Sequence, residues 1–154
     1  MNALRIIDGC RDLPLTRALF LEYAQSLDFD ICFDGFAEEL ASLPGCYGPP
    51  SGCTLIGTLQ DDAVGCVAAR QLDDVRCEMK RLWVRPPYRG QGYGRLLVET
   101  VVDAARDLGY RAMLLHTLES MSEAAALYRS LGFTETSPYD ATDLPGVIFL
   151  RREL

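Results

Sequence analysis

The sequence predicts an α+β fold, a mixed, mainly antiparallel sheet with a central β-α-β unit and flanking helices. Three consecutive strand-like runs, Thr54–Gln60, Val64–Leu72 and Arg76–Val84, are joined by very short turns. Turns of this length require that neighbouring strands are antiparallel. The apolar spacing then becomes helical over 92–108 and returns to a buried strand at 112–117. A strand–helix–strand order predicts that the two outer strands lie parallel.

The N-terminal third is expected to add one strand and two helices. Leu4–Ile7 is a short apolar run typical of a first strand. Asp12 can cap a helix that ends near Ser26, and Asp34 can cap a second helix over Phe36–Leu43. These helices would flank the sheet.

Turn residues mark the remaining boundaries. Asp61-Asp62 and Asp73-Asp74 are the turn signals between the strands of the meander. Gly109 and Gly132 follow two helical patterns, where a left-handed residue commonly closes the last turn. The other expected elements are a helix over Ser120–Leu131 and final strands at 133–135 and 147–151.

Length and composition favour one compact domain over residues 1–154. The chain is 49% hydrophobic, which supplies a sizeable core, and its apolar runs are far shorter than a membrane span. Because the N-terminus has no signal-like apolar segment, we expect a cytoplasmic protein with no membrane partner. The six cysteines form no C-x-x-C pair and His116 is the only histidine, so we expect reduced thiols and no metal site.

The charge distribution favours a small anionic ligand. A net charge of −7 argues against a nucleic-acid partner. The segment from Met79 to Arg95, however, contains no acid and several cations: Lys80, Arg81, Arg85, Arg89 and Arg95. A local cationic segment in an acidic protein suits a phosphate better than a polymer, although a solvated basic face would look the same.

The glycines within this segment predict a phosphate cradle. Gly90, Gly92 and Gly94 let the backbone pass close to an anion at the start of a helix, where N–H groups and the helix dipole favour negative charge. No G-K-[ST] follows, which excludes a P-loop. Arg95 stands where a dinucleotide fingerprint would have its third glycine, so that motif fails as well.

The segment from Glu78 to Arg95 resembles motif A of the GNAT superfamily of acyl-CoA N-acyltransferases. The hallmark [QR]-x-x-G-x-[GA] is met by Arg89, Gly92 and Gly94, and 124–133 resembles motif B, A-x-x-L-Y-x-x-x-G-F. One departure is Met121, where many members have an asparagine, so no asparagine contact to the cofactor is expected.

The resemblance implies a GNAT-like fold with acetyl-CoA as co-substrate and no metal. The pyrophosphate of CoA would be bound by backbone N–H groups of the glycine loop, and the pantetheine arm would lie along the end of the preceding strand. The implied cofactor-binding residues are Leu82, Trp83, Val84, Arg89, Gly90, Gln91, Gly92, Tyr93, Gly94 and Arg95.

Acetyl transfer to an amine requires a base for the ammonium proton and an acid for the leaving thiolate. The resemblance implies Glu78 as the base, eleven residues before Arg89, and Tyr128 of motif B as the acid. The alternatives are a paired glutamate of the sheet surface and a core aromatic. His116 is expected to be structural rather than a proton relay, and alternation turns Cys77 away from Glu78, against a covalent route.

The acceptor is expected to be an amine-bearing small molecule or peptide. Acids cluster around the first two helices, namely Asp28, Asp30, Asp34, Glu38 and Glu39, and they favour a cationic amine. Two other functions stay open, a non-catalytic CoA-binding sensor or regulatory domain and an interaction module with a structural glycine loop. A homodimer is also left open.

Overall fold

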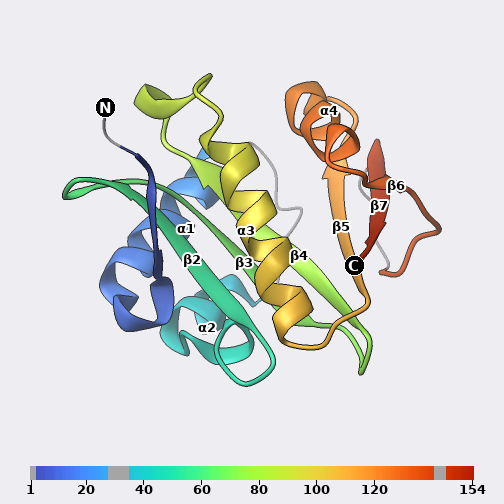
Figure 1. Ribbon diagram of the computed structural model, residues 1–154, viewed down its shortest axis with the longest axis horizontal. Helices are drawn as coiled ribbons and strands as arrows, with labels where there is room; N and C mark the ends of the chain where they lie inside the picture. Colours follow the sequence, from blue (N-terminus) through green and yellow to red (C-terminus); the bar gives the residue numbers. More distant parts are fainter. Residues whose placement is uncertain (1–2, 28–34, 141–144) are drawn as a thin grey trace.

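The computed structural model describes residues 3–27, 35–140 and 145–154. In this part of the chain a seven-stranded sheet has the order β1-β2-β3-β4-β5-β7-β6 (Figure 1). The strands are β1 (Arg5–Asp8), β2 (Cys53–Leu59), β3 (Asp62–Gln71), β4 (Arg76–Val84), β5 (Ala112–Leu118), β6 (Thr134–Glu135) and β7 (Val147–Glu153). All neighbours are antiparallel except β4 and β5, which run parallel. The predicted mixed, mainly antiparallel sheet is confirmed.

Helices cover both faces of the sheet. In Figure 1, α3 (Tyr93–Asp107) crosses in front of the central strands, whereas α1 (Leu13–Ser26) and α2 (Phe36–Ala41) lie behind them. One core cluster joins α3 and α4 (Ser122–Ser130) to the sheet through residues such as Val98 and Tyr128. A second cluster joins α1 and the following segment to the opposite face through Phe20 and Tyr47. The β4-α3-β5 unit at the centre is the predicted β-α-β unit.

Local capping and turn signals account for several helix boundaries. Asp12 caps α1, where its carboxylate accepts a hydrogen bond from the backbone N–H of Leu15. Gly109 and Gly132 follow α3 and α4 with φ of 96° and 93°, the left-handed conformation expected at those positions. The helix α2 ends at Ala41, two residues earlier than predicted, and Gly35 precedes it. The predicted cap Asp34 lies outside the described residues.

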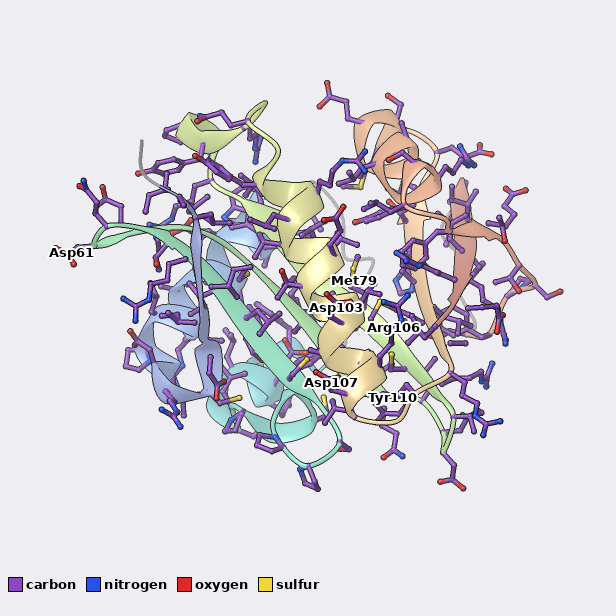
Figure 2. All side chains as sticks on the ribbon, viewed as in Figure 1. Asp61, Met79, Asp103, Arg106, Asp107 and Tyr110 are labelled. Carbon is purple, nitrogen blue, oxygen red and sulfur yellow. The ribbon has the colours of Figure 1, made fainter. Side chains whose placement is uncertain are left out.

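The β2–β3 turn differs from the prediction by one residue. Leu59 pairs with Asp62, so the two turn residues are Gln60 and Asp61 rather than Asp61-Asp62. Gln60 adopts the left-handed conformation with φ of 55°, and Asp61 lies at the tip of the hairpin (Figure 2). Asp62 therefore belongs to β3.

Strand β4 carries an irregularity that the sequence did not predict. Cys66 pairs with Trp83 and Ala68 with Lys80, so three steps along β4 are matched to two along β3. Arg81, inside this bulge, has φ of 61°. A bulge bends and twists its strand, and here it lies where β4 separates from β5.

Candidate active site

The two parallel strands at the centre of the sheet pair over only a short length. Arg76, Cys77 and Glu78 pair with Ala112, Met113 and Leu114, and no pairing with β5 follows within the described part of β4. Beyond this point a cleft of about 840 Å³ is lined by the ends of both strands, the start of α3, α4 and the end of α1. The divergence leaves one edge of β4 from Met79 onward without a partner strand.

The glycine loop forms one end of this cleft. Gly90 and Gly92 adopt φ of 76° and 86°, which L-residues other than glycine rarely adopt, and Gly92 is the residue from which α3 begins. A Cβ atom added to either glycine would meet no atom within 4 Å, so the space beside their backbone N–H groups is open. An exposed helix N-terminus with this room fits the phosphate groups of a CoA molecule.

The cleft is lined by almost all of the predicted cofactor-binding residues. They are Leu82, Trp83, Val84, Arg89, Gly90, Gly92, Tyr93, Gly94 and Arg95, whereas Gln91 lies outside the lining.

Two arginines flank the glycine loop. Arg89 Nε donates a hydrogen bond of 2.9 Å to the carbonyl oxygen of Val84, and its guanidinium lies over the Trp83 ring at 4.8 Å. Arg95 Nη2 donates to Ser130 Oγ at 2.7 Å. Within the described ranges neither arginine forms a salt bridge, so both bring positive charge to this end of the cleft.

Tyr128 projects from α4 into the cleft and packs edge-on against Phe133. Only 7% of the residue is exposed. Burial, with a smaller contribution from Tyr23, raises the pKa of the phenol, so it keeps its proton at neutral pH. A protonated phenol in this position can donate a proton, as the acid role requires.

Glu78 lies just beneath the cleft but is not part of its lining. Its side chain is 1% exposed and accepts hydrogen bonds from Arg70 Nε at 2.7 Å and from the Tyr139 hydroxyl at 2.6 Å. His116 Nδ1 lies 3.4 Å from the second carboxylate oxygen. Burial raises the pKa of Glu78, but the contact with His116, the Lys80 charge, the Tyr139 hydrogen bond and the Arg70 charge together lower it to about 2. This carboxylate is ionised and enclosed, which argues against direct contact with an amine.

His116 reaches the cleft where Glu78 does not. It lines the cleft from β5, and its side chain is 11% exposed. The ring lies between Glu78 and the aromatic rings of Tyr139 and Phe149, at centroid distances of 6.5 and 6.0 Å. Cys77 belongs to the core cluster on the α3 side of the sheet, away from the Glu78 side chain, as alternation predicted.

Two ion pairs connect α1 to Arg85, directly after β4, and α2 to Arg81 within β4. Glu22 of α1 accepts hydrogen bonds from Arg85 Nη2 at 2.7 Å and from Trp83 Nε1 at 3.1 Å. Glu39 of α2 accepts from Arg81 Nη2 at 2.8 Å, and the Arg81 side chain is only 1% exposed. These carboxylates hold the helices against the sheet and are neutralised by their partners.

The described residues do not form the acidic acceptor wall that the sequence predicted. Asp28, Asp30 and Asp34 lie outside the described residues, Glu39 is paired with Arg81, and Glu38 does not line the cleft. Apart from the two arginines of the glycine loop, the charged lining of the described part consists of Lys80, Arg81 and Glu123.

The described part of the chain has neither a cluster of metal-ligating side chains nor a membrane-spanning helix. Residues 3–27, 35–140 and 145–154 contain no group of three or more His, Cys, Asp or Glu side chains that could hold a metal ion. In the same ranges no helix combines the length and apolar character of a membrane span. Cys10, Cys46, Cys53, Cys66 and Cys77 are free thiols.

Sequence comparisons place the chain among N-acetyltransferases. An uncharacterized N-acetyltransferase of Schizosaccharomyces pombe is 39% identical over 146 residues, which cover 94% of this chain and 90% of that protein. The N-acetylaspartate synthetase of Danio rerio is 33% identical over 111 residues, which cover 71% of this chain and 39% of that protein.

Solved structures agree with the fold. A GNAT family acetyltransferase from Elizabethkingia anophelis with acetyl-CoA bound matches over the full length of both chains, with a TM-score of 0.73 and 20% identity. An acetyltransferase from Streptococcus agalactiae gives a TM-score of 0.77 at 18% identity, again over both full lengths. Residues 16–133, more than half of the chain, match the family model described as acetyltransferase (GNAT) family. The chain therefore belongs to the GNAT family and is an acyl-CoA-dependent N-acetyltransferase.

Proposed function

We propose that this protein transfers the acetyl group of acetyl-CoA to a primary amine of a small molecule or peptide by direct attack. The observation that carries the proposal is the cleft between β4 and β5, which begins where their pairing stops and ends at the glycine loop before α3. An amine could approach a thioester in this cleft from the face of the sheet opposite α3. The two substrates could then react without a covalent enzyme intermediate.

The proposed cofactor contacts use mainly the backbone. The N–H groups of 90–95 and the start of α3 would bind the pyrophosphate, with Arg89 and Arg95 supplying compensating charge. The unpaired edge of β4 at Leu82–Val84 would hydrogen-bond the pantetheine arm as a neighbouring strand would. These contacts would hold the thioester between β4 and β5, close to Tyr128.

Tyr128 is proposed to protonate the departing sulfur. When the C–S bond breaks, the CoA thiolate leaves more readily if a proton arrives with it, and a positioned acid contributes about 10²–10⁴ in rate. The phenol suits this task because burial keeps it protonated.

For the acceptor we propose an amine that also carries a carboxylate, in place of the cationic amine that the sequence suggested. Lys80 lines the cleft close to Glu78, on the side of the sheet that faces away from α3. The acids Glu22, Glu39 and Glu78 are each paired with an arginine. The similarity to an N-acetylaspartate synthetase supports the same class of acceptor.

A thiol-release assay with acetyl-CoA and a panel of amines tests the function and the acceptor class together. We expect turnover, with amino acids such as aspartate and glutamate preferred over polyamines at low ionic strength. The preference should fade as salt rises, because charges are screened over about 8 Å at physiological ionic strength. A preference for polyamines would overturn the acceptor class and leave the enzyme proposal intact.

The same assay, combined with calorimetric titration of CoA, separates the alternative functions. Tight CoA binding without thiol release for any amine would favour a sensor or regulatory domain. Absence of CoA binding would favour an interaction module.

A further inference from the structure

A partly buried cluster of polar side chains lies beside the cleft. Glu78 stands at its centre and contacts Arg70 from β3, Tyr139 from the segment before β7 and His116 from β5. Within this cluster His116 lines the cleft, whereas the carboxylate of Glu78 is enclosed. The cluster therefore connects a buried negative charge to an imidazole at the cleft wall.

The contacts fix the orientation of the imidazole. Nδ1 of His116 faces the Glu78 carboxylate, and the ring lies against Tyr139 and Phe149. A carboxylate beside Nδ1 favours the tautomer with hydrogen on that nitrogen, and in this tautomer Nε2 is the basic nitrogen. The same carboxylate stabilises the imidazolium that forms when Nε2 accepts a proton.

We propose that His116 accepts the proton of the acceptor amine and that Glu78 is a positioning residue that acts through His116. This inference rests on the proposed acetyl transfer. In this proposal Glu78 is not the direct base. It orients His116 and stabilises its protonated form, and His116 is the catalytic residue.

The proton balance of the step is complete. The amine nitrogen attacks the thioester carbonyl carbon, a C–N bond forms, and the nitrogen releases one proton to Nε2 of His116. The C–S bond then breaks and the sulfur takes a proton from the hydroxyl of Tyr128. His116 returns its proton to solvent and Tyr128 regains one, so the products are an amide and free CoA thiol.

The chemistry favours the imidazole over the carboxylate. A carboxylate whose pKa is about 2 is a very weak base towards an amine at neutral pH. An imidazole is far better matched to neutral pH, where general bases work best.

The first test removes the base and restores it chemically. We expect His116→Ala to lower kcat about a hundredfold, while the affinity for CoA measured by calorimetry stays unchanged. Added imidazole should raise the rate of this variant in proportion to its unprotonated fraction, and it should not raise the rate of the wild type. A merely structural role would give no rescue that follows imidazole ionisation.

The second test uses the acidic limb of the pH–rate profile of kcat/KM. Among the described residues, the charged group nearest His116 is Glu78; Lys80 and Arg70 act on Glu78, and Asp140 acts on Tyr139. Glu78→Gln keeps the shape but leaves the cations uncompensated, so the limb should move down by about one pH unit. Tyr139→Phe removes the hydrogen bond to the oxygen that faces His116, so the limb should move up.

Shifts of opposite sign cannot arise from a general loosening of the fold. Tyr128→Phe is the matched comparison, because it should lower kcat and leave this limb in place. The proposal is overturned if His116→Ala retains the wild-type rate and limb, or if Glu78→Gln and Tyr139→Phe leave the limb unmoved. Absence of turnover in the wild type with every amine would instead contradict the proposed function itself.

Discussion

Replacing Tyr128 by phenylalanine is expected to lower kcat about a hundredfold and to change the KM for acetyl-CoA little. The variant keeps the ring that packs against Phe133 and removes only the hydroxyl. Since the lost group acts when the C–S bond breaks, the loss should appear in the chemical step rather than in binding. Steady-state kinetics with a saturating amine will measure it.

A matched control separates this effect from a packing defect. Phe133→Leu perturbs the partner of the Tyr128 ring and leaves the hydroxyl in place. We expect it to reduce thermal stability and to retain more activity than Tyr128→Phe. A Tyr128→Phe variant with the wild-type kcat would remove Tyr128 from the proton-transfer role.

The buried carboxylate of Glu78 is expected to make the stability of the protein depend on acid pH. Its pKa is about 2 in the folded chain against an ordinary value of 4.5, so the folded state binds the proton less readily than the unfolded state. The stabilisation is complete above the unfolded pKa and is lost as pH falls from 4.5 towards 2. Its size is about 3 kcal/mol, because each unit of pKa difference corresponds to about 1.4 kcal/mol.

Urea unfolding of the wild type and of Glu78→Gln at several pH values measures this contribution. The wild type should exceed the variant in free energy of unfolding at pH 7, and the gap should shrink below pH 4.5. Asp103→Asn is a suitable control, because Asp103 lies on the outer face of α3 in an exposed pair with Arg106 (Figure 2). A gap that stays constant from pH 7 to pH 3 would contradict the assigned environment of Glu78.

Local signals in the sequence predicted most of the fold. The capping carboxylate of Asp12, the glycines after α3 and α4, and the two periods of apolar residues each act within a few residues of the chain. The glycine loop was likewise readable, since Gly90 and Gly92 adopt the conformations for which glycine is needed.

The features that escaped prediction depend on contacts between distant segments. Glu78 meets Arg70 across a hairpin, His116 across the parallel pair and Tyr139 from a loop, so its burial could not be read from its own strand. In the bulge, Arg81 adopts the left-handed conformation, which is uncommon for residues other than glycine, so no signal in the sequence predicted it. The bulge became visible only in the register between β3 and β4.

The central claim, that the cleft beside the glycine loop binds CoA, is tested most directly by calorimetric titration of CoA into two variants at Gly94. Added atoms at this position would contact Leu127 and Val84, both of which line the cleft, at 3.6 and 3.7 Å. Gly94 is a residue of α3, so alanine suits its backbone better than glycine does. We expect Gly94→Ala to bind CoA nearly as the wild type does. Gly94→Val should weaken binding about ten- to hundredfold, because its extra methyl groups occupy cleft space beside Leu127 and Val84. Equal CoA affinity in the wild type and in a folded Gly94→Val variant would contradict the account.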